Sequence, residues 1–373
     1  MPEDNTKASM PVPGPALITV LQRINGTWVE SQLTDAHSHV FHKAQFVDDL
    51  PFDGRLVTIA GSQPRLCAWS KAGPDWTCEV LWNPKFGGRQ DRLRDFEIGD
   101  VHGNGKDAIA IGTHDQGVVA VLSRIGEQWN AQEIDRAPRT FVHEIELGDT
   151  DGDGQLEIFA TPSQPNQATL ASQPGRIVQY QFEGTKVFKR TIADLKTTHC
   201  KEILAVDVDQ DGKDELVAAI EARTEILGGK TEVVEPIQIV LFRAVEGEFA
   251  AETLATIPDQ MCRVLCKGDI DGDGRTDIIA TAMKSGIWWL QQADGGKWER
   301  KLIDRNSSGI EHAATLHDFD GKGRDSIFVV SEREGELRKY SYDGSKFLKT
   351  TITKTPKNAI TFCITSSWTK PLN

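Results

Sequence analysis

The sequence predicts an all-β fold, a seven-bladed β-propeller built from four-stranded antiparallel blades. The first observation is an aspartate-rich turn that recurs at intervals of 51, 49, 58, 62 and 49 residues. The first aspartates of its copies are Asp49, Asp100, Asp149, Asp207, Asp269 and Asp318. A regular repeat of this length, with several short strands in each unit, is typical of propeller blades rather than of a solenoid.

The second observation is an aromatic residue that opens the last strand of each unit. These residues are Trp28, Trp76, Trp129, Phe188, Phe249, Trp298 and Phe347, which makes seven aromatics for six turns. The segment 361–368 falls where a seventh innermost strand should begin. We expect it to form the last blade with N-terminal strands around 17–21 and 28–33, because joining the two chain ends removes an exposed sheet edge.

Each unit divides into the same four strands. In the fifth unit we expect them at 263–267, 277–282, 286–291 and 298–303. Short strands separated by glycine-rich turns suit an all-β repeat. Residues 15–373 are therefore expected to form a single propeller domain, preceded by a loose polar tail at 1–14.

The aspartate-rich turns carry ligands for a hard cation. In 268–281 (GDIDGDGRTDIIAT), acidic side chains stand at the first, third, fifth and ninth positions counted from Asp269. Ca²⁺ takes about six to eight oxygen ligands, and alternate carboxylates can converge on it. The twelfth position is Ala280, where an EF-hand has a glutamate, and the flanking residues read as strands. The pattern therefore predicts a calcium turn between two strands.

Three of the turns have all four acidic residues, and we expect structural Ca²⁺ in each of them. The predicted ligands are Asp149, Asp151, Asp153, Glu157, Asp207, Asp209, Asp211, Glu215, Asp269, Asp271, Asp273 and Asp277. The turns at Asp49, Asp100 and Asp318 lack one or more of these acids, so the sequence leaves their occupancy open.

Composition excludes several classes of partner. The formal net charge is −13, which argues against nucleic acid because phosphate binding needs a basic face. No run of 18 apolar residues is present, so no membrane span is expected. The first 14 residues have no apolar stretch of a secretory signal, and the six cysteines form no CxxC pair. These features favour a cytoplasmic location, although calcium turns are also common in periplasmic and extracellular proteins.

A ring of basic residues is the candidate functional site. The residues that open the inner strands are His42, Arg94, His143, Lys201, Arg263 and His312, with Thr361 in the seventh place. Inner strands converge on the propeller axis, so these side chains should surround one mouth of the central channel. Three long connections, at 83–91, 162–175 and 222–236, should overhang the same mouth, opposite the calcium turns.

Residues of this kind can serve more than one purpose. A neutral imidazole accepts a proton near pH 7, and Arg or Lys stabilises a developing oxyanion. The histidines could instead hold a second divalent metal. Acidic neighbours such as Asp95, Glu144 and Glu202 leave open a third interpretation, internal salt bridges without a site. On the same face, His114, Lys284 and Arg89 are expected to be surface residues.

The repeated D-x-D-x-D-G turn in a β-rich context resembles the FG-GAP/VCBS repeat family, which includes the integrin-type calcium propellers. The resemblance covers about 40–350 and implies the fold. The chain also resembles, more weakly, the propeller domain of aldos-2-ulose dehydratases, which remove water from keto-sugars. The cupin-like domains of that family are lacking here, so the resemblance implies at most the elimination step.

Two functions follow as hypotheses. The first is a carbohydrate-acting lyase or dehydratase, in which His42, His143 or His312 takes a proton from a keto-sugar or a uronate. Arg94, Lys201 and Arg263 would then stabilise the resulting oxyanion. The second is a non-enzymatic module, stabilised by calcium, that binds sugars or proteins; the lack of a nucleophile motif such as GxSxG is compatible with it.

Overall fold

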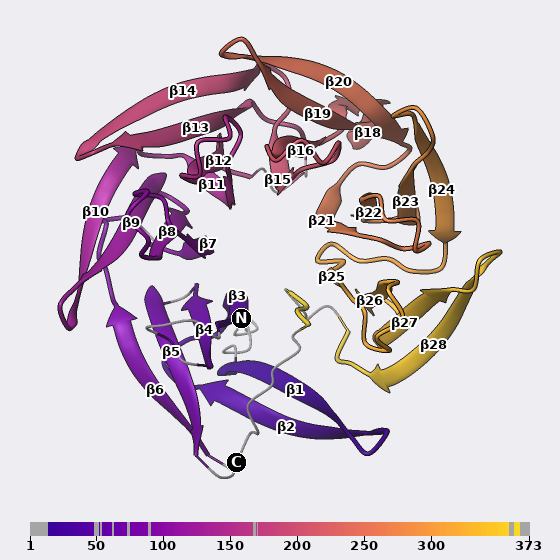
Figure 1. Ribbon diagram of the computed structural model, residues 1–373, viewed down its shortest axis with the longest axis horizontal. Coiled ribbons are helices and arrows are strands. Elements are labelled where there is room, and N and C mark those ends of the chain that lie inside the picture. The colour runs from indigo at the N-terminus through magenta and orange to yellow at the C-terminus, as the bar shows by residue number, and fades with distance from the viewer. Residues whose placement is uncertain are drawn as a thin grey trace, which may run out of the picture.

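The computed structural model shows strands arranged radially around a central hub, with the first strand of each sheet innermost (Figure 1). It describes residues 14–47, 52, 54–61, 63–72, 75–88, 91–166, 169, 171–357 and 362–365. Within this part of the chain, no helix is long and apolar enough to cross a membrane.

In the described part of the chain, six four-stranded antiparallel sheets form the blades, and five of them use four strands that are consecutive in the chain from the hub outward. The first three are β3 (Phe41–Val47), β4 (Arg55–Ala60), β5 (Arg65–Ala72) and β6 (Asp75–Trp82); β7 (Leu93–Gly99), β8 (Ala108–Thr113), β9 (Val118–Ile125) and β10 (Gln128–Arg136); and β11 (Phe141–Gly148), β12 (Glu157–Ser163), β13 (Gly175–Glu183) and β14 (Lys186–Leu195). The other three are β15 (Cys200–Val206), β16 (Glu215–Ile220), β19 (Ile237–Val245) and β20 (Glu248–Ile257); β21 (Cys262–Gly268), β22 (Asp277–Ala282), β23 (Gly286–Gln292) and β24 (Trp298–Asp304); and β25 (Ala314–His317), β26 (Ser326–Ser331), β27 (Glu336–Tyr342) and β28 (Phe347–Lys354).

The prediction of seven blades is wrong, because the structure has six four-stranded blades. The place between the last and first blades is taken by a two-stranded hairpin of β1 (Ala16–Ile24) and β2 (Thr27–Asp35) (Figure 1). The described part of the C-terminal segment, 362–365, forms no strand. It contributes Phe362 and Ile364 to an apolar cluster instead, and the rest of 361–368 lies outside the described residues.

The blades are held together by apolar contacts between neighbouring sheets. The second strands β8, β16, β22 and β26 are buried along their whole length, as expected for strands covered on both faces. Large aromatics fill the spaces toward the rim. For example, the Phe52 ring stacks on the Trp129 ring with centroids 5.6 Å apart, and Trp289 packs edge-on against Phe347.

The fourth blade carries an insertion between its second and third strands. The expected long connection at 222–236 folds into a hairpin of β17 (Arg223–Leu227) and β18 (Lys230–Glu235). It is joined to the long connection before β13, because the backbone N–H of Ser172 donates to Thr224 Oγ1 at 2.7 Å. The hydroxyl of Thr231 also donates to the carbonyl of Thr169 at 2.8 Å. Two insertions from neighbouring blades therefore form one continuous wall.

Candidate functional site

Five of the predicted basic residues occupy the same structural position, a β-bulge near the start of an inner strand. In β3, β7, β15 and β21, the cross-strand register skips one residue, which is His42, Arg94, Lys201 and Arg263 respectively. In β11 the register shifts between Val142 and Ile145, across His143. A bulge leaves its extra residue out of the ladder and re-aims the side chain. The repeat thus turns five nitrogen-bearing side chains away from the sheets.

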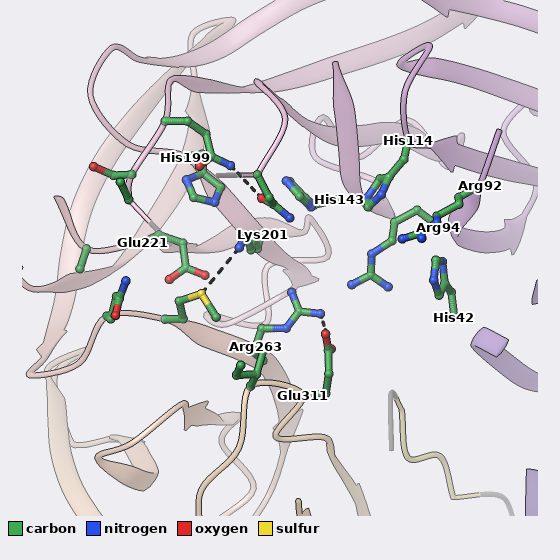
Figure 2. A pocket seen from close by; sticks show the side chains of 18 residues that line it. His42, Arg92, Arg94, His114, His143, His199, Lys201, Glu221, Arg263 and Glu311 are labelled. Carbon is green, nitrogen blue, oxygen red and sulfur yellow. Dashed lines mark hydrogen bonds and ion pairs between the residues drawn. The ribbon is translucent and has the colours of Figure 1, made fainter. Parts of the chain in front are cut away.

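These side chains meet in one cavity of about 220 Å³ at the hub (Figure 2). The ionisable residues that line it are His42, Arg92, Arg94, His114, His143, His199, Lys201, Glu221, Arg263 and Glu311. The wall formed by the two insertions contributes Asn166, Ser172 and Gln173 to the lining. The cavity therefore lies on the face where the long connections were expected.

His312, the sixth predicted residue, does not line this cavity. Strand β25 begins only at Ala314 and its register is regular, so no bulge turns His312 toward the hub. Its ring is fully buried, with Nε2 2.8 Å from Ser307 Oγ and Nδ1 2.8 Å from the carbonyl of Ala282. The structure thus places His312 in a polar contact between two blades.

Five ionisable residues of the cavity lie outside the predicted basic ring, and one of them, His114, is buried here rather than at the surface as expected. Two of them precede inner strands, as His199 stands two positions before Lys201 and Arg92 two positions before Arg94. His114 and Glu221 follow second strands instead. Polar residues just before an inner strand, or just after a second strand, therefore line the same mouth as the bulged basic residues. This rule could have found them from the sequence. Glu311 is also drawn in, and its Oε2 accepts a bond of 2.7 Å from Arg263 Nη2.

Four imidazoles form an arc along one side of the cavity (Figure 2). Successive ring centroids from His42 through His114 and His143 to His199 are 6.4, 5.4 and 5.7 Å apart. Burial lowers the pKa of all four rings, and nearby cations such as Arg94 and Lys201 lower it further; for His42 and His199 the pKa falls to about 3. All four are therefore neutral at pH 7.

The hydrogen bonds of His143 define its tautomer. Its Nε2 lies 2.9 Å from Ser163 Oγ, and the hydroxyl of Ser163 donates its only hydrogen to the carbonyl of Gln164 at 2.8 Å. Nε2 must therefore carry the proton and donate to Ser163. The lone pair of His143 is then on Nδ1, the nitrogen with which a neutral imidazole accepts a proton.

The cationic residues of the cavity differ in their pairing. Arg263 is bound to Glu311. The ion pairs among the described residues include none of Arg92, Arg94 and Lys201, although the Asp115 carboxylate opposes the lowering of the pKa of Arg92. Burial lowers the pKa of Lys201 to about 8, and its Nζ is 3.7 Å from Met261 Sδ. Burial raises the pKa of Glu221 to about 7.

The acidic residues of the inner strands follow the bulges in the chain. They bond to neighbouring inner strands and so connect the blades. Asp95 Oδ2 accepts the backbone N–H of Ile145 at 2.7 Å, and Glu202 Oε1 accepts that of Leu265 at 3.2 Å. Lys43 Nζ is 2.9 Å from Asp95 Oδ1 and also contacts Glu97. The interpretation as internal salt bridges therefore holds for Lys43 with Asp95 and Glu97 and for Arg263 with Glu311, whereas Arg94 and Lys201 are in none of the ion pairs among the described residues.

Three of the aspartate-rich turns bring carboxylates together. Ligand atoms lie within 4.8 Å of one another in three groups: Asp149, Asp151, Asp153 and Glu157; Asp207, Asp209 and Glu215; and Asp269, Asp271 and Asp273. Asp211 and Asp277 are not in these groups. Asp277 accepts the backbone N–H of Ile270 and of Gln292, each at 3.2 Å, with one bond to each of its oxygens.

The turn at Asp149 fits a cation best. Glu157 Oε1 is buried without a hydrogen-bond partner, and burial raises the pKa of Glu157 to about 7. A cation among the four carboxylates would satisfy this oxygen. In the turn at Asp207, by contrast, Arg243 already supplies positive charge, with contacts of 3.1 Å to Asp209 and 2.9 Å to Glu215.

A second metal at the histidine arc stays a prediction. Within the described part of the chain, groups of three or more converging ligand atoms occur only in the aspartate-rich turns. The cations that lower the pKa of His114 and His199 would also repel a metal cation. The field in the cavity suits an anion better.

No family model matches the chain, and no curated protein matches it. Among solved structures, it is similar to the periplasmic gluconolactonase PpgL of Pseudomonas aeruginosa, with 12% sequence identity, a TM-score of 0.57, and coverage of 91% of this chain and 92% of that one. A chain of a nidogen/laminin complex is similar with 14% identity and a TM-score of 0.44 over 81% of this chain and 98% of that one. The gluconolactonase similarity supports a β-propeller. Membership of the FG-GAP/VCBS family stays a prediction.

Proposed function

We propose that the protein is a carbohydrate-acting lyase that eliminates a β-substituent from a sugar acid or a keto-sugar. The observation that carries this proposal is the meeting of a neutral His143, with its lone pair on Nδ1, and the unpaired guanidinium of Arg94 in one buried cavity. Elimination next to a carboxylate or carbonyl needs both a base for the α-proton and a cation for the developing oxyanion.

The residues divide the reaction between them. Arg94 holds the substrate carboxylate or carbonyl and stabilises the enolate oxygen that forms. His143 Nδ1 takes the α-proton, and the electrons of the C–H bond form the new double bond. The carbon–oxygen bond at the β-position then breaks, and the leaving oxygen takes a proton from the ammonium of Lys201. With a pKa of about 8, Lys201 is protonated at pH 7 and releases its proton readily.

The test replaces His143 and follows the absorbance of unsaturated sugar with uronate and keto-sugar substrates. His143→Ala should lower kcat/KM by about 100-fold to 10,000-fold, the range for loss of a general base. His102→Ala is the matched control, because His102 lies in the turn that follows β7, where its Nε2 contacts Ser123 Oγ. Full activity of His143→Ala would overturn the mechanism. Binding of sugars without any turnover by the natural protein would instead support the non-enzymatic binding module.

For the turn at Asp149, the proposed ligand is a structural Ca²⁺. Asp149, Asp151, Asp153 and Glu157 would hold it, since oxygen ligands of this charge suit a hard cation. The ion would neutralise carboxylates that otherwise repel one another and so hold the turn in place.

A further inference from the structure

The charges that line the cavity do not balance. Among the described lining residues, four cationic side chains, Arg92, Arg94, Lys201 and Arg263, face two carboxylates, Glu221 and Glu311. The acids beyond the bulges do not make up the difference, because burial raises the pKa of Glu202 to about 8 and that of Glu144 well above its usual range. The cavity therefore keeps an excess of at least two positive charges at pH 7 when only its own lining is counted.

Two of these cations are close to each other at one side of the cavity. Figure 2 shows Arg92 and Arg94 beside His42 and His114, whereas Lys201 lies on the other side with Glu221 and His199. Burial lowers the pKa of Arg92; the Asp115 carboxylate opposes this shift and the charge of Arg94 adds to it. Arg92 Nε is buried without a hydrogen-bond partner. Such an arrangement is costly unless an anion completes it.

The two arginines occupy different depths. Arg94 is the bulged residue inside β7, and Arg92 precedes that strand by one residue, nearer the mouth where the strand begins. One acidic group on Arg94 therefore leaves Arg92 free for a second acidic group on the same molecule. This second position was not part of the predicted basic ring.

The cavity is also small and partly closed. Its volume of about 220 Å³ is below the roughly 300–1,000 Å³ typical of pockets for drug-sized ligands. The wall of the two insertions bounds it on one side, where Gln173 Nε2 donates to Asn166 Oδ1 at 2.8 Å. Its described lining includes no Trp, Tyr or Phe on which a sugar chain could stack. These features suit one compact molecule rather than the interior of a polysaccharide.

We infer that the cavity binds a single, small sugar acid with two acidic groups, one held by Arg94 and the other by Arg92. This inference rests on the elimination site proposed above and specifies its substrate class. The shared chemistry is a carboxylate on Arg94 with a second carboxylate or a phosphate on Arg92, because a guanidinium binds either group through paired N–H donors. Arg92 would then determine specificity.

Isothermal titration calorimetry with three ligands of the same carbon chain tests the inference without any turnover. D-gluconate has one acidic group, D-glucarate has a second carboxylate, and 6-phosphogluconate has a phosphate in its place. At least one of the two doubly acidic ligands should bind about tenfold or more tightly than gluconate. Which of them does so distinguishes a carboxylate from a phosphate at Arg92. Equal affinity for all three ligands would overturn the inference.

Variants locate the second acidic group. Arg92→Gln should remove most of the preference for the doubly acidic ligand, whereas Arg92→Lys, which keeps the charge, should retain much of it. Arg94→Gln should weaken binding of all three ligands. Arg124→Gln, an equal change of charge on the exposed part of β9, should change none of them. A preference that survives Arg92→Gln would overturn the assignment of Arg92.

The two proposals fail separately. If the doubly acidic ligand binds and no substrate is turned over, the substrate-class inference stands and the lyase proposal fails. If unsaturated sugar forms from singly acidic substrates while glucarate and 6-phosphogluconate bind no tighter than gluconate, the lyase proposal stands and the inference about the second acidic group fails.

Discussion

Lys201 differs from an ordinary surface lysine because it is buried among other cations. Desolvation lowers its pKa to about 8, with a further lowering by Arg263 that Glu221 opposes. In the proposed elimination, its protonated form supplies the proton to the leaving oxygen. Its titration therefore should be visible in the activity.

The first prediction concerns the dependence of kcat/KM on pH. Since the active form of Lys201 is protonated, activity should fall as the pH rises through about 8. His143 should not limit activity above pH 6.5, because burial holds its pKa well below that value. Lys201→Arg keeps the positive charge at all these pH values and should shift the alkaline limb upward in whatever activity remains. An unchanged limb in Lys201→Arg would assign the titration to another group.

At the residue scale, the sequence predicted the cavity residues that occupy the same position in each repeat. His42, Arg94, His143, Lys201 and Arg263 were found because the same offset from the preceding strand recurs in each unit. The bulge that re-aims them depends on pairing with the next strand, and no local pattern shows it. His312 has the right offset but lacks the bulge, which is why its side chain remains between blades.

At the element scale, the hairpin β17–β18 could have been predicted from the local sequence. Gly228 and Gly229 have positive φ values of 58° and 78°, which suits the two-residue turn between Leu227 and Lys230. A Gly-Gly pair between two short runs rich in β-branched residues is a hairpin signal in the sequence itself. Its contact with Ser172 depends on the neighbouring blade and could not be predicted in this way.

The aspartate-rich turns are elements whose conformation the sequence predicted in part. The alternation of aspartates brought the first three acids together in the turns at Asp149 and Asp269. In all three turns the ninth-position acid accepts the backbone N–H of the residue after the first aspartate, but Glu157 and Glu215 also join their groups whereas Asp277 does not. One methylene group of length and the neighbouring strand decide the difference.

The second prediction tests the proposed Ca²⁺ at Asp149. Adding Ca²⁺ to protein treated with EDTA should raise the Tm, because a ligand that binds only the folded state stabilises it by about 2.7 kcal/mol at a concentration 100 times its Kd. Glu157→Gln should reduce this rise, measured by differential scanning calorimetry, since it replaces a charged ligand. Glu183→Gln, on the exposed end of β13, is the matched control. A Ca²⁺-dependent rise of equal size in Glu157→Gln would rule out this turn as the source.

At the scale of the whole molecule, the propeller consists of four-stranded blades and one two-stranded hairpin. Six blades have four strands, and the hairpin of β1 and β2 fills the remaining arc between β28 and β6 (Figure 1). The periodicity of the sequence correctly predicted the radial sheets. The count of seven relied on aromatics, and Trp28 marks the second strand of a hairpin, not the outer strand of a full blade. How the two distant ends of the chain pair, and how many strands they form there, is not encoded in any local sequence pattern.

The third prediction follows from this closure. Leu33 of β2 is 1% exposed and belongs to the apolar cluster with Phe41, Leu56 and Trp69 of the first blade, against which Phe362 also packs. Leu33→Ala should lower the free energy of unfolding by about 2–5 kcal/mol, the cost of removing a buried leucine side chain. Urea denaturation measures this change.

Leu17→Ala serves as the control, because Leu17 lies in the same hairpin but is 49% exposed. A substitution at such a position should change the free energy by no more than about 0.5 kcal/mol. If Leu33→Ala were as mild as Leu17→Ala, the hairpin would contribute little to the closed ring. A large effect of Leu33→Ala alone would mean that the packing of the β1–β2 hairpin on the first blade and on Phe362 stabilises the whole folded ring.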